Sequence, residues 1–499
     1  MDFLDPKKRR NHKIRLMIGY ALVAIAIGLA TVILIYGANG YGFNTKTGSV
    51  VQNGLLFVDS KPGGADIYLN NKHVSTTSAR LVLAAGTYNL KIAKSGYRDW
   101  QRPIALDAQT IDRFVYPFLF PTKPRVTGIK NYTSQPNLVT ETPDRHYLLV
   151  QVPSADPATI SFDQYDTGKL TQAPTVITLP AGLLTNASET GGSLTQVDWS
   201  TDNSHLLLKH TYSGGSEFIV FNRAVPADSF NINKNLGINP SDVQLRNSKV
   251  DQLYIYDSAT QSLAVADTTK DIVNKPFLTH VLAFKGYGTS LLTYITDNKT
   301  PAGQVQARIW DNGQTYALAK LVAGSSYLLD AAQYAGDWYY AVGSNGTDQT
   351  YLYKNPLSSL QNASQGKALS FISLRVPGAT KIDFSTNTRF VEVEGGQNFG
   401  VYDFETDTRY QYVLKAPLVG PLQWMDGHRL MGESNGQTFV MDYDGTNQQA
   451  LTATNYDLGG YFSSDYNHLL TTAPNTDNAA VVLQNVDMRA GGDLPASTQ

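Results

Sequence analysis

Residues 442–447, with the sequence DYDGTN, place oxygen-bearing side chains at alternate positions, as the first half of a calcium-binding loop does. Such a loop ends in a glutamate about twelve positions in that binds the ion with both oxygens, and this sequence has no glutamate there. Asp and Gly are also the residues that a tight hairpin turn needs. We therefore favour a turn, with calcium binding as the alternative.

Histidines are the second set of candidate metal ligands. Three of them, His146, His205 and His468, follow polar turns by similar offsets, which favours a structural position in a repeat over a metal site. The absence of Cys excludes disulfides, thiol nucleophiles and Cys-ligated metals. Counting from His73, the histidines of the chain are His73, His146, His205, His210, His280, His428 and His468.

Sequence motifs of known catalytic or phosphate-binding sites are absent. No HExxH pair, G-x-S-x-G elbow or P-loop occurs. The segment 286–290, GYGTS, lacks the third glycine and the helix pattern of a phosphate-binding loop. The sequence therefore predicts no catalytic residues, no cofactor and no metal, and a protein that is not an enzyme.

Aromatic side chains are the remaining candidates for binding, because they can line a rim and stack on sugars or on side chains of a partner. The alternative is that most of them are core residues at alternating strand positions. The ligand-binding residues stay unidentified at this stage. The candidates are Trp199, Trp310, Trp338, Tyr339, Tyr340 and Trp424.

A repeated unit must position these residues, and it is clearest in residues 196–223. A short strand ends at Asp198-Trp199-Ser200, a polar turn follows, and two more strands are separated by Gly214-Gly215. Such a meander cannot bury its apolar face alone. Further copies begin at Glu141, Phe384, Trp424 and Phe462.

The end of the third strand marks each unit by an apolar or aromatic residue followed by a polar one. The marks are 35 to 59 residues apart, with a mean near 46, a period typical of a β-propeller. We expect eight blades over residues 125–490, with seven as the alternative and two sandwiches of unrelated hairpins as the other fold. The marks are Phe162-Asp163, Phe221-Asn222, Tyr256-Asp257, Trp310-Asp311, Tyr353-Lys354, Tyr402-Asp403, Met441-Asp442 and Leu483-Gln484.

The turn and strand in residues 200–207 and 463–470 resemble the SPDG-type turn of TolB-like propellers, which are WD40-like in architecture. Residues 442–445, followed by Leu451-Thr452, are similar to the hairpin that closes their blades. This resemblance implies an all-β fold. Propellers have many unrelated functions, so it implies no particular activity.

Residues 16–36 contain no charge over 21 positions, enough to span about 30 Å of hydrocarbon as a helix. A buried helix and a cleaved signal peptide are the alternatives. Residues 1–15 hold six Lys or Arg, and only Lys46 is close on the other side. We therefore expect a cytoplasmic tail over 1–15, a membrane helix in contact with the lipid bilayer over 16–36, and the bulk of the chain outside.

Residues 37–53 are rich in Gly, Asn and Thr, and we expect a flexible linker there. Short alternating runs between residues 54 and 120 predict a small β-sandwich. This stretch resembles the PEGA domain in Pro62-Gly63-Gly64-Ala65, in the Asn70-Asn71 turn and in Ala85-Gly86-Thr87-Tyr88, although Gly63 replaces the Glu of the motif. The resemblance implies a non-catalytic binding or spacer role outside the cytoplasm.

The net charge of the chain limits the classes of partner that we expect. With the tail removed, residues 16–499 carry a net charge of −6, since 34 basic residues face 40 acidic ones, and a nucleic-acid surface would need a basic stripe. We expect a disordered tail over 491–499. The first hypothesis is an anchored binding or scaffold protein for an envelope protein or a cell-wall glycan; the alternatives are an envelope hydrolase at the mouth of the channel and the sensory part of a signalling complex.

Overall fold

The structure is a computed structural model of the 499-residue chain. It describes residues 6–38, 41–43, 50–154, 156, 159–187, 192–362, 366–454, 458–474 and 481–493. The chain forms two compact units. Unit 1 contains the described residues up to Lys123 together with Ala490–Asp493, and unit 2 contains Pro124–Arg489.

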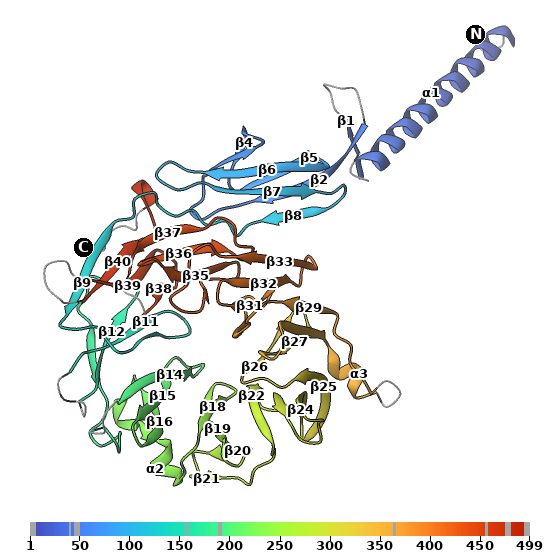
Figure 1. The fold of residues 1–499 in the computed structure, drawn as a ribbon. Coiled ribbons are helices and arrows are strands. Elements are labelled where there is room, and N and C mark those ends of the chain that lie inside the picture. The colour runs from blue at the N-terminus through green and yellow to red at the C-terminus, as the bar shows by residue number, and fades with distance from the viewer. Residues whose placement is uncertain are drawn as a thin grey trace. The chain divides into compact units, whose positions relative to one another are not determined.

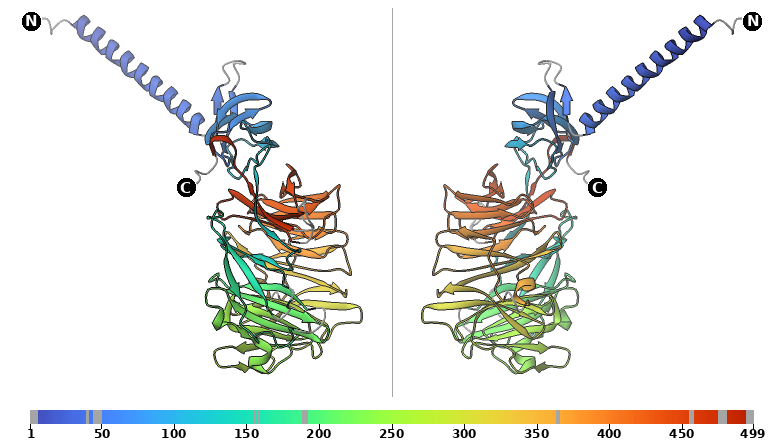
Figure 2. Two further views of the ribbon diagram at one scale, coloured as in Figure 1. Left: turned by 90° about the vertical axis from the view of Figure 1, so that its left-hand side faces the viewer. Right: turned by 90° about the vertical axis from the view of Figure 1, so that its right-hand side faces the viewer.

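Unit 1 begins with helix α1 (Pro6–Ala38), which is continuous in both views of Figure 2. From Arg10 onward none of its side chains is buried. Within the described residues it is the one helix that is long and apolar enough to cross a membrane. The predicted span of 16–36 lies inside it, and the helix extends by nearly three turns into the basic segment.

The rest of unit 1 is a β-sandwich, as the sequence predicted. Its core contains Leu56, Ile67, Leu90 and Trp100, from both sheets. One sheet has β1 (Tyr41–Phe43), β2 (Val50–Val58), β5 (Ala79–Ala84) and β8 (Ile111–Phe114), and the other has β4 (Lys72–Thr76), β3 (Asp66–Leu69), β6 (Gly86–Ala93) and β7 (Trp100–Leu106).

The predicted turn at Asn70-Asn71 joins β3 to β4. Both residues have positive φ, of 49° and 64°. Asn tolerates the left-handed conformation better than most residues, and a two-residue hairpin requires it. The local sequence therefore determines this hairpin.

Two predicted boundary segments differ from the structure. Part of the expected linker over 37–53 is ordered strand, because β1 pairs with the start of β2. The tail expected to be disordered over 491–499 starts with a 3-10 turn at Gly491–Asp493, and residues 494–499 lie outside the described residues. The turn is held because Asp493 contacts Lys94 Nζ at 2.8 Å and accepts a hydrogen bond from Tyr97 Oη at 3.1 Å.

Unit 2 is a β-propeller in which the described residues form eight four-stranded antiparallel sheets. Figure 1 shows the sheets following one another around a ring, with the first strands β14, β18, β22 and β26 on its inner side. The all-β class and the propeller architecture are thus confirmed, while the expected number of blades stays a prediction.

The strands of the first four sheets are β10 (Val139–Glu141), β11 (Tyr147–Gln151), β12 (Ser161–Asp166) and β13 (Thr175–Thr178); β14 (Ser193–Trp199), β15 (His205–Tyr212), β16 (Gly215–Asn222) and β17 (Phe230–Asn231); β18 (Asp242–Arg246), β19 (Lys249–Asp257), β20 (Ser262–Asp267) and β21 (Ile272–Val273); and β22 (Val281–Tyr287), β23 (Leu291–Thr296), β24 (Gln304–Asp311) and β25 (Gln314–Val322).

The other four sheets contain β26 (Tyr327–Tyr334), β27 (Asp337–Ser344), β28 (Gln349–Lys354) and β29 (Ile372–Arg375); β30 (Lys381–Phe384), β31 (Phe390–Gly395), β32 (Asn398–Asp403) and β33 (Thr408–Val413); β34 (Gln423–Trp424), β35 (Arg429–Ser434), β36 (Gln437–Asp442) and β37 (Gln449–Ala453); and β38 (Gly460–Phe462), β39 (His468–Pro474), β40 (Val481–Asp487) and β9 (Val126–Tyr132). Short helices are α2 (Ile232–Leu236), α3 (Pro356–Leu360) and the 3-10 turn Pro226–Asp228.

The marks are in the third strand of every sheet but one, although Phe162-Asp163 and Leu483-Gln484 lie inside β12 and β40 and not at the strand end where the pattern placed them. Tyr256-Asp257 ends β19, the second strand of its sheet, so this mark was wrong. Asp257 accepts hydrogen bonds from Ala259 N and Thr260 Oγ1, as a residue that opens a turn does. The third strand β20 ends instead at Asp267, after a small alanine that the pattern could not detect.

A hydrogen-bonded turn precedes the second strand of four sheets. In residues 463–468, Ser463 Oγ donates to Asp465 at 2.7 Å and accepts from His468 N at 3.0 Å, while Asn467 N donates to Asp465 at 2.9 Å. The turn needs a left-handed residue at its fourth position, which is Arg145, Asn203, Thr388 and Tyr466 in the four copies. The other copies start at Thr142, Ser200 and Ser385.

The ring closes because β9, from the start of unit 2, pairs with β40 at its end. A buried polar cluster connects β9 to the next sheet. Asp163 on β12 accepts hydrogen bonds from Lys130 Nζ at 2.6 Å and Tyr132 Oη at 2.7 Å. The Asp163 side chain is fully buried and that of Lys130 is 37% exposed, so the carboxylate is shielded from solvent while the lysine is only partly so.

We expect Asp163→Asn to lower the free energy of unfolding by about 2 kcal/mol, because Lys130 and Tyr132 lose a buried carboxylate. Urea unfolding followed by tryptophan fluorescence measures the change. Asp267→Asn is the matched control, since its partner Lys270 is 68% exposed and such pairs contribute less than about 1 kcal/mol. An equal loss in both variants would contradict the role of Asp163 in closure.

Candidate ligand-binding site

The first strands of four successive sheets carry ionisable side chains on the inner side of the ring. Asp198 lies on β14, Asp242 on β18, Lys285 on β22 and Asp330 on β26. Lys285 Nζ contacts Asp330 Oδ1 at 2.7 Å. Burial raises the pKa of Asp198 to about 6, although Trp199 N–H and Lys285 act in the opposite direction, and burial also raises the pKa of Asp242. The charges here are therefore mixed.

An inner cavity of about 910 Å³ opens between these four strands. Asp198, Asp242 and Lys285 line it together with Tyr287 and Trp338. A cavity of this size is within the range of small-molecule binding sites.

An outer cavity of about 720 Å³ adjoins it. The two share Asn247, Tyr287, Gly288 and Trp338, and we call them together the double cavity. All of its lining residues belong to unit 2.

Hydrogen bonds and ring contacts hold the shared residues in place. Tyr287 Oη donates to Asp330 Oδ1 at 3.2 Å, and its ring meets Trp338 edge-on at 6.4 Å. Trp338 N donates to Asn355 Oδ1 at 2.8 Å, and Asn355 N donates back to Trp338 O. The site is thus preorganised on strands and their turns.

Of the aromatic candidates, some line the double cavity and others are packed in the core. Trp338 is half-buried and lines both cavities. Tyr340 is 1% exposed and lines the outer one. Trp199, Tyr339 and Trp424 are buried in the core, and Trp310 packs on Phe277 at 5.0 Å.

Sequence reasoning missed the polar part of the lining. Residues 286–290 had been set aside as an incomplete phosphate loop, yet this turn borders both cavities. Asn247 comes from the turn between β18 and β19, whereas Asn355 and Gln361 both come from the connection between β28 and β29. The left-handed backbone of Asn247 and Asn355, with φ of 58° and 45°, is seen in the structure and not in the sequence, so no sequence signal distinguished these residues from the Asn of other turns.

The histidine positions have structural contacts. His205 Nδ1 lies 2.9 Å from Asp202, and His468 Nδ1 lies 3.1 Å from Asn485. His210 is buried against Glu217 at 3.0 Å. The described residues contain no group of three or more His, Asp or Glu able to hold a metal ion.

Glu217 resembles a catalytic carboxylate in its pairing with His210, but its oxygens are fully engaged. They also accept from Thr185 Oγ1 at 2.6 Å, Asn231 Nδ2 at 2.6 Å and Asn186 N at 3.2 Å. Burial alone would raise the pKa of Glu217, yet these hydrogen bonds hold it below its usual value. The pair fastens the segment around Thr185 to its sheet.

The candidate calcium loop is a turn at the end of β36. Asp444 Oδ1 accepts from Thr446 N and Thr446 Oγ1, and Asp442 Oδ2 accepts from Asn447 Nδ2 at 2.9 Å. The carboxylates are therefore bonded within the turn, which supports the turn interpretation of residues 442–447.

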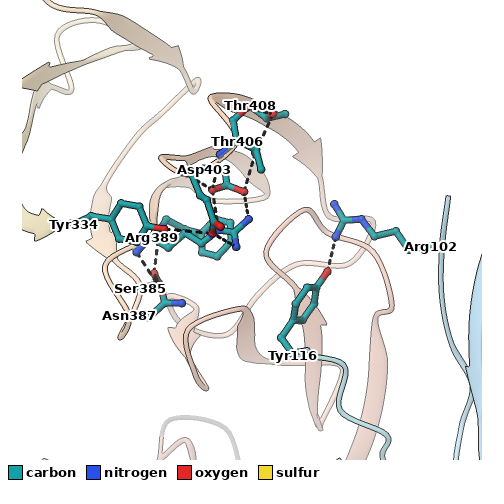
Figure 3. Close-up of polar contacts among 11 residues, drawn as sticks. Arg102, Tyr116, Tyr334, Ser385, Asn387, Arg389, Asp403, Thr406 and Thr408 are labelled. Atoms are coloured by element: carbon teal, nitrogen blue, oxygen red, sulfur yellow. Dashed lines mark hydrogen bonds and ion pairs between the residues drawn. The ribbon is translucent and has the colours of Figure 1, made fainter. Parts of the chain in front are cut away.

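An ion-pair cluster fixes another turn of the ring (Figure 3). Arg389 donates to both oxygens of the fully buried Asp403, at 2.9 and 2.6 Å, and also pairs with Glu405. Tyr334 Oη donates to Glu405 at 3.3 Å, which connects β26 to the next sheet. Because these charges are paired with one another, the cluster is a structural element.

Glu392 on β31 is fully buried, and neither of its carboxyl oxygens has a hydrogen-bond partner among the described residues. The Lys381 Nζ atom is 4.0 Å away. Burial raises the pKa of Glu392 to about 8, with Lys381 acting against it and Glu394 and Asp383 adding to it. The side chain is therefore protonated in the folded protein at neutral pH.

The raised pKa of Glu392 predicts that the free energy of unfolding depends on pH. Between pH 4.5, the usual pKa of the group, and about 8, the folded chain retains a proton that the unfolded chain releases, so stability falls as pH rises. We expect Glu392→Gln to raise the free energy of unfolding by about 1–3 kcal/mol at pH 8 and to flatten the profile.

Melting temperatures measured from pH 5 to 9 test this. Asp228→Asn, at an exposed carboxyl, is the control and should leave the profile unchanged. A Glu392→Gln profile parallel to the wild type would show that Glu392 does not retain the proton.

Residues 53–116 match the family described as PEGA domain. The two-sheet sandwich of unit 1 is therefore a PEGA domain, and the resemblance seen in the sequence is confirmed. No curated protein matches the chain.

Solved structures similar to unit 2 are β-propellers or contain them. The oligogalacturonate lyase of Vibrio parahaemolyticus is 11% identical with a TM-score of 0.37, over 74% of this chain and 99% of that one. The Cps50 (Swd1) β-propeller domain of Myceliophteria thermophila is 10% identical with a TM-score of 0.39, over 65% and 97%. Dihydro-heme d1 dehydrogenase NirN is 11% identical with a TM-score of 0.42, over 73% and 79%. At these values the fold assignment rests on the sheet topology.

Proposed function

We propose that this protein is a membrane-anchored binding protein whose propeller presents the double cavity to a ligand of the cell envelope. The observation that carries this proposal is the half-buried Trp338, which lies between two large adjoining cavities on strands of successive sheets. An aromatic anchor in a preformed concave site is typical of ligand recognition.

Membrane anchoring is supported by α1, whose side chains from Arg10 to Ala38 are all exposed. Exposing an apolar surface of that length to water is unfavourable, and a bilayer removes the cost. The six basic residues before residue 16 favour a cytoplasmic N-terminus. The PEGA domain then acts as a spacer between membrane and propeller.

The proposed membrane topology predicts a pattern of cysteine labelling. Because the sequence contains no Cys, an introduced cysteine is its only reactive thiol. In intact cells we expect Val82→Cys, at a 63% exposed side chain of the PEGA domain, to react with a membrane-impermeant maleimide. Asn11→Cys, on the basic side of α1, should react only after lysis. The reverse pattern would rule out the proposed orientation.

A hydrolase is the second candidate function, because Asp198 and Asp242 line the same cavity and burial raises the pKa of both. A protonated and an ionised carboxyl in one cavity are the groups that glycoside hydrolysis uses. New reducing ends released from oligosaccharides by the full chain, and abolished by Asp198→Asn, would favour this function over binding alone.

Binding itself is tested by capture from native envelopes with the full chain in detergent. We expect Trp338→Ala to lose the captured ligand and Trp310→Phe to retain it, because Trp310 lines neither cavity. Equal capture by both variants would place the interaction elsewhere.

A further inference from the structure

We propose that the outer half of the double cavity is a subsite for one ring of a neutral saccharide, with Trp338 as the stacking surface and Tyr340 as a hydrogen-bonding group. This inference rests on the proposed binding function and specifies its ligand class. It is carried by three independent properties of the lining: an aromatic platform, an unpartnered buried hydroxyl and the nearly uncharged wall.

The platform is the indole of Trp338. It lies between the two cavities. Its ring centroid is 6.4 Å from that of Tyr287 and 6.1 Å from that of Tyr340. These contacts fix the orientation of the indole, so little entropy is lost when a ligand stacks on it. The C–H face of a pyranose offers a flat apolar surface to such a ring.

The hydroxyl of Tyr340 lacks a hydrogen-bond partner among the described residues although the side chain is 1% exposed. A buried hydroxyl without a partner costs about 1–3 kcal/mol, and in native structures such a group calls for a specific explanation. Tyr340 lines the outer cavity, so a ligand hydroxyl placed there would satisfy it.

The remaining polar groups are amides and hydroxyls held in place by neighbours. Asn355 Nδ2 donates to Asp337 at 2.6 Å, and Gln361 Nε2 donates to Asp311 at 3.2 Å. Asn and Gln side chains retain further donor and acceptor capacity. This composition suits the vicinal hydroxyls of a sugar.

The charge of the outer-cavity lining distinguishes neutral from acidic sugars. Among the residues that the structure describes, Asp311 is the one acidic residue that lines the outer cavity, and none of its lining residues is Lys, Arg or His. A uronate or phosphorylated sugar would meet a carboxylate with no compensating cation among these lining residues, which is unfavourable. Lys285 lines the inner cavity, where it is paired with Asp330. The outer subsite therefore favours neutral over acidic saccharides.

The test uses the full chain in detergent and isothermal titration calorimetry with neutral hexasaccharides of the β-glucan, chitin and mannan types, and with hexagalacturonate as the acidic probe. We expect binding of at least one neutral probe and at least tenfold weaker binding of the acidic one. Trp338→Ala should weaken the binding of the neutral probe at least tenfold, and Trp338→Phe should weaken it less. Tyr340→Phe should weaken it by about threefold to tenfold.

Melting temperatures separate binding from folding. Because Tyr340 Oη has no hydrogen-bond partner among the described residues and a buried hydroxyl without a partner is costly, Tyr340→Phe should keep or raise the wild-type melting temperature while losing affinity. Trp310→Phe is the control for both measurements. Asp311→Asn should narrow the difference between neutral and acidic probes.

The proposal is overturned if no neutral probe binds in a Trp338-dependent way, or if hexagalacturonate binds as tightly as the neutral probes. A protein captured from envelopes in a Trp338-dependent way, without saccharide binding, would overturn the saccharide assignment and leave the proposed binding function standing. If neither capture nor saccharide binding depends on Trp338, both proposals fail.

Discussion

The pairing of β9 with β40 is the contact on which the rest of unit 2 depends. Each four-stranded sheet has apolar residues on both faces, so each needs a neighbour on either side. A row of such sheets leaves two faces and an open strand edge exposed unless its ends meet. Closure by the strand from the start of the unit removes these edges, and the contact of Lys130 with the buried Asp163 carboxylate joins the closing strand to the next sheet.

The same ring brings the candidate site together. Its inner strands place Asp198, Asp242 and Lys285 around one cavity although they are more than 40 residues apart in the chain. The interfaces between sheets differ in chemistry. Val391 and Val393 on β31 pack in an apolar cluster with the preceding sheet, whereas the alternating Glu392 and Glu394 are buried on the other face. The ring thus tolerates polar interfaces at some sheets and apolar ones at others.

Much of the fold could be predicted from the sequence because its signals are local. The polar turns, the Asn70-Asn71 hairpin and the uncharged stretch of 16–36 depend on residues that are neighbours in the chain. The mark at Tyr256 was wrong because this signal is only local. An Asp that opens a turn has the same local signature after a second strand as after a third. The ordered turn at Gly491–Asp493 depends on Lys94, nearly 400 residues earlier, and no local pattern contains it.

The candidate site shows the same limit. Trp338 could be named from its residue type, but the sequence did not distinguish it from Trp199 and Trp424, which are core residues. That distinction depends on what faces each ring from neighbouring sheets. Of the shared lining residues, Tyr287 ends β22 while Asn247 and Gly288 lie in turns, and they form one site because neighbouring sheets pack together.

Ring closure also sets the order of events during biosynthesis. The partner of β9 is β40 (Val481–Asp487), which begins 349 residues after β9 ends at Tyr132. A nascent chain must therefore carry β9 with an unsatisfied backbone edge until β40 has left the ribosome. Premature termination before Val481 would leave that edge exposed permanently, and such fragments should aggregate or be degraded rather than persist as shorter rings.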